Sequence, residues 1–239
     1  MTTIKEINVG KIDPSIKEVL KKLVNVNLDF FVVGGLLCQY YLKEHARYTK
    51  DVDILYNAEE KAVEEELKKE FGTIDFFYSN GTDSFYEPYF TCFTKVDGLR
   101  GQVEGKKINF LSEIKTELYS YEGITFKGVC IEYMIAEKLV SLLNELSRPY
   151  KHLVDIYSFT KIDQSLLDKK EIKRYVSLIN SQENEFRKSI NVKEQVLPKQ
   201  ILDDKQLNPP IVVPTLQSKY NVSKEEMISE VNEWLKTVL

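Results

Sequence analysis

Residues 30–55 read FFVVGGLLCQYYLKEHARYTKDVDIL, and this stretch decides the fold that we expect. Its apolar run, Phe30–Val33, is typical of a buried strand, which Gly34 and Gly35 bring to an end. Glycines at this point let the backbone come close to a ligand, and the free N–H groups of a following helix can bind an anion. The stretch therefore predicts a strand, a turn suited to a phosphate group, and a helix.

Two aspartates follow at the end of the same stretch. Asp51 and Asp53 alternate with apolar residues over 51–55, and a period of two puts both carboxylates on one face of a strand, with Cα atoms roughly 6.5 Å apart. Such a pair suits Mg²⁺, which takes oxygen ligands and often bridges to substrate phosphates. Acidic pairs on exposed strands are commonly just solvated, so it is their ordered combination with the two glycines that favours a metal site.

This combination resembles the signature of the nucleotidyltransferase superfamily of the polymerase-beta type, in which Gly-Gly is followed after about a dozen residues by Asp-hydrophobic-Asp. Leu36 stands where a serine is frequent in that signature. The resemblance implies a mixed α/β (α+β) fold. A catalytic domain with a mixed sheet flanked by helices would span residues 1–130, and a helical domain over residues 131–239 would complete the active-site cleft.

The resemblance also implies where an NTP would bind. Gly34 and Gly35, with the N-terminus of the following helix, would seat the β and γ phosphates. Three residues before Asp51 are further candidates for nucleotide binding: Arg47, Thr49 and Lys50. The two basic residues among them could pair with phosphate oxygens, although each could equally be an ordinary exposed charge.

A second informative segment covers residues 132–159, EYMIAEKLVSLLNELSRPYKHLVDIYSF. Apolar residues recur in it at helical spacing: Ile135, Leu139, Leu142 and Leu146. Lys138 borders this stripe, so its side chain either reaches water along its apolar stem or points into a cleft. Pro149 favours the start of a new helix, on which Lys151 and Asp155 fall one turn apart. An ordinary surface ion pair is the alternative for these last two residues.

The same segment resembles the second half of the AbiEii/AbiGii-type nucleotidyltransferase toxins, in which a Lys-Leu helix precedes an Arg and a Lys-Asp-x-x-Asp helix. The pattern carries over to Lys138, Arg148, Lys151 and Asp155, while His152 stands where the pattern has Asp. The resemblance implies that the two lysines and the arginine bind the triphosphate. It also implies that Asp155 orients a lysine or a substrate hydroxyl, so that Lys138 and Asp155 are catalytic.

Relatives carry a third carboxylate on a later strand of the sheet. The best candidate strand, 107–111, places Asn109 at that position, and its amide oxygen can coordinate a metal but adds no charge. Glu104 precedes a glycine and is expected in a turn before that strand. The sequence therefore leaves open whether Asp51 and Asp53 hold the metal alone, with Asn109 or with Glu104.

The resemblance implies Mg²⁺-dependent transfer of a nucleoside monophosphate from an NTP to a hydroxyl acceptor, with release of pyrophosphate. RNA, in particular the tRNA acceptor end, would be the acceptor, in a toxin–antitoxin or phage-defence setting with a cognate antitoxin protein. One alternative is an antibiotic nucleotidyltransferase that acts on an aminoglycoside or lincosamide. Another is a catalytically silent nucleotide-binding module, which Asn109 in place of a carboxylate would favour.

Composition excludes several other classes. The chain is 43% hydrophobic and 29% charged, as is usual for globular proteins. Its net charge of −4 argues against indiscriminate nucleic-acid binding, although 169–174 could form a local basic patch. Three cysteines without metal-ligand spacing and two histidines argue against a zinc site and fit reduced thiols in a cytoplasm. No apolar stretch is long enough to span a membrane, and we expect a cytoplasmic protein that does not bind one.

The remaining pattern predicts the other elements. We expect helices over 14–24 and 57–71, around the stripe over 135–146, and over 224–239; a strand over 124–129; strands and hairpins over 74–111; and helical structure beyond residue 160. Aromatic residues gather over 76–89. They could stack nucleic-acid bases, but in a sheet we favour packing as their role.

Overall fold

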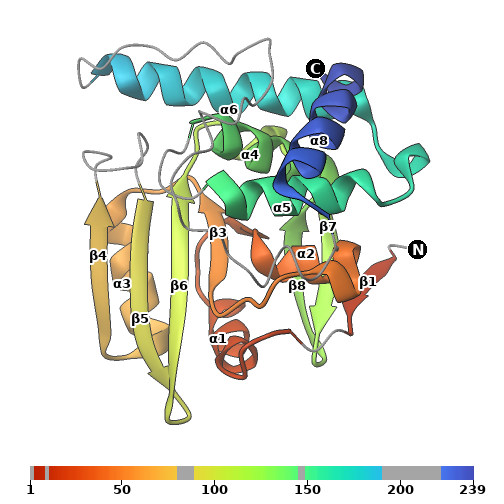
Figure 1. The fold of residues 1–239 in the computed structure, drawn as a ribbon. Coiled ribbons are helices and arrows are strands. Elements are labelled where there is room, and N and C mark those ends of the chain that lie inside the picture. The colour runs from red at the N-terminus through yellow and green to blue at the C-terminus, as the bar shows by residue number, and fades with distance from the viewer. Residues whose placement is uncertain (1–2, 9–10, 80–88, 145–148, 190–221) are drawn as a thin grey trace. The chain divides into compact units, whose positions relative to one another are not determined.

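The computed structural model describes residues 3–8, 11–79, 89–144, 149–189 and 222–239 (Figure 1). The chain divides into two compact units, Met1–Cys130 and Ile131–Leu239, and each is described by itself below. The first unit is built on a mixed sheet with helices packed on it, and the second consists of helices among its described residues. The expected mixed α/β class is confirmed.

The sheet of the first unit has eight strands: β1 (Ile4–Ile7), β2 (Phe30–Val33), β3 (Val52–Tyr56), β4 (Ile74–Ser79), β5 (Tyr89–Val96), β6 (Leu99–Lys107), β7 (Thr116–Tyr121) and β8 (Ile124–Val129). Their order across the sheet is β1-β7-β8-β2-β3-β6-β5-β4. The pairs β1–β7, β2–β8 and β3–β6 are parallel, and the other neighbours are antiparallel. Strand β3, which contains Asp53 and directly follows Asp51, therefore lies in the interior of the sheet, between β2 and β6.

The helices of this unit are α1 (Ser15–Leu23), α2 (Gly35–Leu42) and α3 (Glu60–Phe71), with short 3-10 turns η1 (Lys43–His45) and η2 (Leu111–Glu113). In α3, Val63, Leu67 and Phe71 recur every four residues and are buried. Gly72, at φ 78°, ends α3 as expected. The helix begins at Glu60 rather than near residue 57.

Helices α1 and α3 pack on one face of β4, β5 and β6, and Figure 1 shows α3 behind β4 and β5. A Cβ on Gly101 would lie 2.5 Å from Val19 Cγ2 of α1, so this face of β6 touches the helix. Thr94 of β5 pairs with Gly101 and is buried on the same side. Because side chains alternate along a strand, the residues between these positions point to the opposite face.

The turn between β5 and β6 corrects one expectation. The chain turns at Asp97 and Gly98, which both have positive φ (49° and 80°), the geometry that a two-residue hairpin requires. Glu104, expected in a turn, therefore lies within β6, and the expected strand over 107–111 is wrong. Gly105 is paired within the strand, and a glycine is needed there because a Cβ would lie 2.1 Å from Cε1 of Phe90.

The second unit contains α4 (Ile131–Asn144), α5 (Pro149–Thr160), η3 (Gln164–Leu166), α6 (Lys169–Ser189) and α8 (Lys224–Val238). Helix α4 packs against α5 and α6, and α8 packs against the same two helices. Trp234 of α8 donates its indole N–H to Gln164 Oε1 at 2.5 Å, which links α8 to η3. None of the described helices is both long and apolar enough to cross a membrane.

Candidate active site

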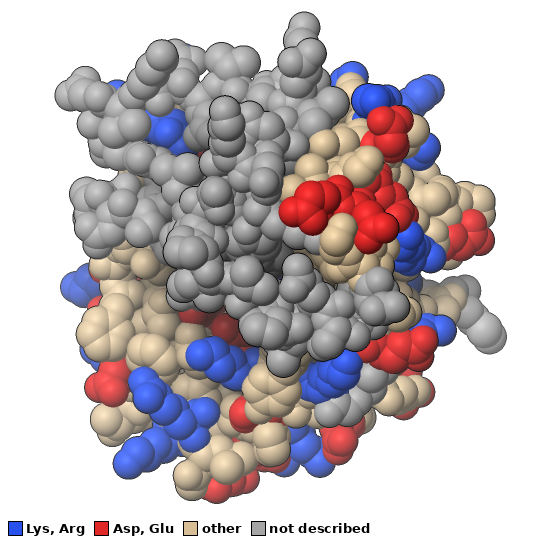
Figure 2. Space-filling view, viewed as in Figure 1, with Lys and Arg blue, Asp and Glu red and all other residues tan. Residues whose placement is uncertain are grey.

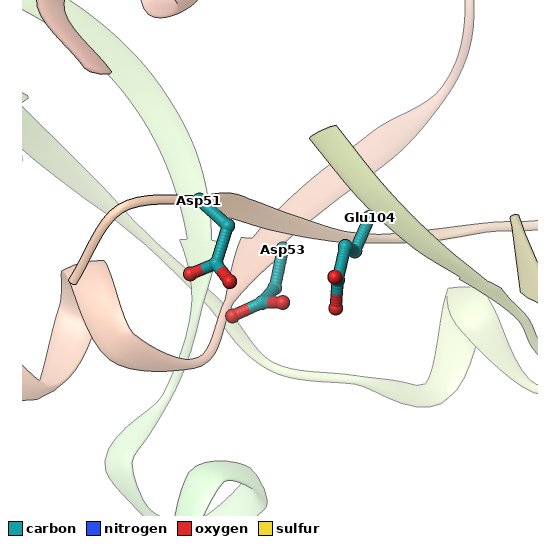
Figure 3. Close-up of side chains that lie close together, drawn as sticks. All are labelled: Asp51, Asp53 and Glu104. Atoms are coloured by element: carbon teal, nitrogen blue, oxygen red, sulfur yellow. The ribbon is translucent and has the colours of Figure 1, made fainter. Parts of the chain in front are cut away.

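Three carboxylates converge on one face of the sheet. Asp51 lies just before β3, Asp53 lies in β3, and Glu104 is the residue of β6 that pairs with Asp53. One oxygen from each carboxylate lies within 4.8 Å of the others, and Figure 3 shows all three groups directed to the same side. Each residue is partly buried. Three anionic groups at this spacing repel one another, and an all-oxygen set of this kind fits a hard divalent cation such as Mg²⁺.

The glycine turn borders this cluster. Val33, the last residue of β2, pairs with Asp53, so the turn follows directly beside that carboxylate. Gly34 has φ 77° and ψ −145°, and a Cβ on it would lie 2.0 Å from Asp53 Oδ2. The N–H of Gly35, the first residue of α2, donates to the same oxygen at 3.4 Å. The two glycines therefore make room for the carboxylate as well as for a ligand at the start of α2.

Thr49 connects the turn to Asp51. Its side chain is buried, and its hydroxyl donates to Asp51 Oδ1 at 3.3 Å. A Cβ on Gly35 would lie 2.6 Å from that hydroxyl oxygen, so Thr49 packs against the first turn of α2. Its backbone is held on both sides: its N–H donates to the carbonyl of Lys11 at 3.0 Å, and its carbonyl accepts from the N–H of Asp13 at 2.9 Å. These contacts fix the segment that leads into β3.

The other two candidates before Asp51 have different surroundings. Arg47 is partly buried, and its carbonyl accepts a hydrogen bond from Nε2 of the buried Gln39 of α2 at 2.6 Å. Lys50 is exposed. The two cations before Asp51 therefore differ: Lys50 is exposed, whereas Arg47 is partly buried and its backbone is hydrogen-bonded to α2.

Glu104, rather than Asn109, accompanies the two aspartates. Nε2 of Gln102, two residues earlier on the same strand face, donates to Glu104 Oε1 at 2.6 Å and orients it. Asn109 follows β6 and is exposed, five residues beyond Glu104, which is about 16 Å along an extended chain. Polar residues alternate with glycine or valine within 100–107, a pattern that indicates a strand containing Glu104. The expectation of a turn at Glu104, which was based on the glycine that follows it, concealed this arrangement.

The second motif lies in the helical unit. Lys138 of α4 is 7% exposed and Asp155 of α5 is 2% exposed, and these two helices pack against each other. Burial of Asp155 rules out the ordinary surface ion pair, because a solvated pair leaves its carboxylate in water. His152, at the position where the pattern has Asp, is buried as well. Arg148 and the side chain of Lys151 lie outside the described residues, although the Lys151 backbone belongs to α5.

Comparisons with known proteins add the following. The family model described as "Nucleotidyl transferase AbiEii toxin, Type IV TA system" matches residues 19–235. Among solved structures, the chain is similar to JHP933 from Helicobacter pylori, with 15% identity, coverage of 93% of this chain and 90% of that chain, and a TM-score of 0.43. It is also similar to an antigenic nucleotidyltransferase-like protein from Paracoccidioides brasiliensis (15% identity, 74% and 91% coverage, TM-score 0.42). A third similar structure is the antibiotic-resistance factor ANT(2'')-Ia (13% identity, 74% and 95% coverage, TM-score 0.43). No curated protein matches the chain.

Proposed function

Since this chain belongs to the AbiEii family of nucleotidyltransferases, the toxins of type IV toxin–antitoxin systems, we propose that it transfers a nucleoside monophosphate from an NTP to a hydroxyl of RNA. Pyrophosphate is the other product, and the acceptor end of tRNA is the proposed target. The observation that supports this reaction is the cluster of Asp51, Asp53 and Glu104 beside the Gly34–Gly35 turn. The protein would act as the toxin partner of a cognate antitoxin, in the cytoplasm.

The triphosphate would bind at the start of α2. The first N–H groups of a helix have no partner within the helix and carry partial positive charge, which favours an anion. Gly35 brings this backbone close to the carboxylates without a side chain in the way. Arg47 and the exposed Lys50 would add positive charge next to Asp51.

Asp51, Asp53 and Glu104 would hold the divalent cation, for which we propose Mg²⁺. When bound, Mg²⁺ neutralises charge on phosphoryl oxygens and acts as a Lewis acid. The cluster offers only carboxylate oxygens, which are the ligands that Mg²⁺ prefers over nitrogen or sulfur.

Glu104 is the proposed general base. Glu104 lies on the β6 side of Asp53, whereas the glycine turn lies on the β2 side. The acceptor and the leaving group would therefore lie on opposite sides of Asp53. The acceptor hydroxyl gives its proton to Glu104, and its oxygen forms a bond to the α-phosphorus. The bond from that phosphorus to the bridging oxygen breaks, and pyrophosphate leaves with the electron pair. Gln102 keeps the Glu104 carboxylate oriented for this transfer.

We further propose that the helical unit contributes to the same reaction. Lys138, Arg148 and Lys151 would neutralise triphosphate charge, and Asp155 would orient a lysine or the acceptor hydroxyl. The burial of Lys138 and Asp155 supports a role beyond that of solvated charges.

The test is incubation of the full chain with Mg²⁺, each of the four labelled NTPs, and total tRNA or a panel of aminoglycosides and lincosamides. We expect label on tRNA with release of pyrophosphate from the wild type. In Asp53→Asn, which keeps the size of the side chain, we expect about a 10- to 100-fold loss, because the amide adds no charge to hold the cation. Equal labelling by both proteins would remove Asp53 from the mechanism, and label on a drug alone would replace RNA as the acceptor.

A catalytically silent module is the less supported alternative. It rested on an amide, Asn109, as the third group, whereas the carboxylate of Glu104 lies close to those of Asp51 and Asp53. Silence would now require nucleotide binding without pyrophosphate release, which the same incubation measures.

A further inference from the structure

Among the described residues of the first unit, no helix packs on one face of β4, β5 and β6. On the face packed against α1 and α3, Phe90, Cys92 and Thr94 of β5 are buried. On the opposite face the alternate residues are less buried, and Phe77 of β4 is 60% exposed. We define the open face by the residues that the argument uses: Phe77, Thr91, Phe93, Arg100, Gln102 and Glu104.

The open face begins at the carboxylate cluster. Asp53 pairs with Glu104, Glu104 pairs with Thr91, and Thr91 pairs with Phe77. Paired residues in neighbouring strands point to the same side of a sheet, so these four form one row across β3, β6, β5 and β4. Three strand spacings separate the ends of the row, or about 14 Å. A strand of RNA whose end reaches Glu104 would thus lie over Thr91 and Phe77.

The direction of the reaction points to the same side. The glycine turn, where the triphosphate would bind, lies on the β2 side of Asp53, and Glu104 lies on the β6 side. In an in-line displacement the attacking oxygen enters opposite to the leaving group. The acceptor therefore approaches from β6, and the open face is the surface next to its reacting end.

The chemistry of the open face suits unpaired nucleotides. The rings of Phe77 and Phe93 lie 6.1 Å apart at 69°, and the guanidinium of Arg100 stacks over the Phe93 ring with its Cζ at 4.3 Å. Aromatic rings and guanidinium planes are the groups on which unpaired bases stack. The exposed Lys95 pairs with Arg100, and Figure 2 shows Lys and Arg side chains gathered over the lower part of β5 and β6.

We propose that the open face binds the unpaired nucleotides next to the reacting end of the acceptor RNA. Phe77 and Phe93 stack bases, and Arg100 and Lys95 contact backbone phosphates. The assignment rests on the proposed function, since it takes RNA as the acceptor.

The first measurement is binding of a fluorescein-labelled single-stranded RNA to the full chain, without NTP, by fluorescence anisotropy. Phe77→Ala is expected to weaken binding about 5- to 150-fold, the effect of losing one stacked base. Phe77→Tyr keeps the ring and is expected to stay within about twofold of the wild type. Leu166→Ala, which removes an apolar side chain that is 69% exposed in the helical unit, is the matched control and should change nothing.

The second measurement is the salt dependence of the same binding. Arg100→Gln is expected to reduce the slope of log K against log salt by about 0.7, the contribution of one phosphate contact to a single strand. Lys61→Gln removes the same charge from α3, where Lys61 is 88% exposed, and is expected to leave the slope unchanged. Equal slopes in Arg100→Gln and the wild type would overturn the role of Arg100.

Transfer kinetics separate this assignment from the proposed function. With tRNA as acceptor, Phe77→Ala is expected to raise the KM for RNA and to leave kcat and the KM for NTP unchanged. A raised KM for NTP instead would assign the ring to the nucleotide base and overturn the proposal. If no RNA is labelled at all, the proposed function fails, yet loss of RNA binding in Phe77→Ala would still support the open face. Unchanged RNA affinity in Phe77→Ala overturns the proposal. The same result is expected if the open face binds a protein instead of RNA.

Discussion

Gly34 and the carboxylate of Asp53 occupy neighbouring space so closely that any side chain on the glycine would displace the acid. The same turn needs a backbone conformation, φ 77° with ψ −145°, that L-residues rarely adopt. Two separate constraints therefore require glycine here, one from the backbone and one from the site. Thr49 adds a third contact at this scale, because its hydroxyl binds Asp51 while its backbone is held by residues 11–13.

Gly34→Ala is expected to destabilise the protein by about 2–4 kcal/mol, through strain and overpacking, and to reduce transfer at least about 100-fold. Gly123→Ala is the matched control, since Gly123 also has positive φ (81°) but has nothing within 4 Å of its would-be Cβ. Gly123→Ala is expected to lower the free energy of unfolding by about 1 kcal/mol and to leave activity intact. Urea unfolding and the labelling assay measure both effects. Equal losses in the two variants would show that the clash with Asp53 has no consequence.

At the scale of elements, a polar network holds α2 against the edge of the sheet. Lys5 of β1, Tyr41 of α2 and Tyr119 of β7 all donate to Oε2 of Glu117, at 2.5, 2.7 and 2.9 Å. The hydroxyl groups of the two tyrosines also lie 2.8 Å apart. Because α2 begins at Gly35, this network anchors the helix whose first turn borders the carboxylates.

The network predicts a dependence of stability on pH. Burial of Glu117 opposes its ionisation, but the hydrogen bonds from Lys5, Tyr41 and Tyr119 outweigh burial and lower the pKa of Glu117 below its ordinary value of 4.5. An acid with a lowered folded-state pKa stabilises the protein above its unfolded-state pKa, and this contribution is lost as pH falls. The free energy of unfolding should therefore decrease as pH falls below about 5.

Glu117→Gln is expected to be less stable than the wild type at pH 7 and to lose less stability between pH 7 and pH 4. Urea unfolding followed by circular dichroism at both pH values measures this difference. Glu122→Gln, which removes an acid 51% exposed and paired with Lys17, should follow the wild type closely. Parallel pH profiles for Glu117→Gln and the wild type would show that the network does not act through the charge of Glu117.

How well the sequence predicted these elements depended on the strength of each local pattern. The strands over 30–33 and 124–129 and the helix α1 were confirmed, because apolar runs and helical spacing mark them. Strands β1 and β7 were missed, since IKEI and TELYSY mix charged and apolar residues and are specified by their pairing with each other. The long-range register of β6 against β3, which brings Glu104 to Asp53, cannot be inferred from either strand alone.

The aromatic residues of β4 were only partly predicted. Packing holds for Phe76, which stacks on the buried Phe90 with centroids 5.0 Å apart. It is wrong for Phe77, which is 60% exposed, because neighbouring residues of a strand point to opposite faces. Phe85 and Tyr86 lie outside the described residues. Lys138 and Asp155 stay predictions as catalytic residues.

At the scale of the whole molecule, the three carboxylates that would hold the cation also lower the stability of the protein when no cation is bound. Without a cation, three acids with oxygens within 4.8 Å repel one another, and neutralising one of them relieves that repulsion. Asp53→Asn is therefore expected to melt at a higher temperature than the wild type in the absence of divalent ions, while it loses transfer activity.

With added Mg²⁺ or Mn²⁺, the wild type should instead melt at a higher temperature than Asp53→Asn. A ligand at 100 times its Kd stabilises by about 2.7 kcal/mol, which corresponds to roughly 5–10 °C for a unit of this size. We expect this shift for the wild type and a much smaller one for Asp53→Asn in thermal melts of the full chain. The same shift in both proteins would place the bound ion elsewhere.

The strand order also sets when activity can arise during synthesis. A ribosome releases Asp51 and β3, which contains Asp53, well before β6 brings Glu104, and β1 and β2 wait for β7 and β8 to pair with them. A nascent chain therefore lacks the complete cluster of carboxylates until nearly the whole first unit has left the exit tunnel. Any activity that depends on all three carboxylates can therefore arise only after that point.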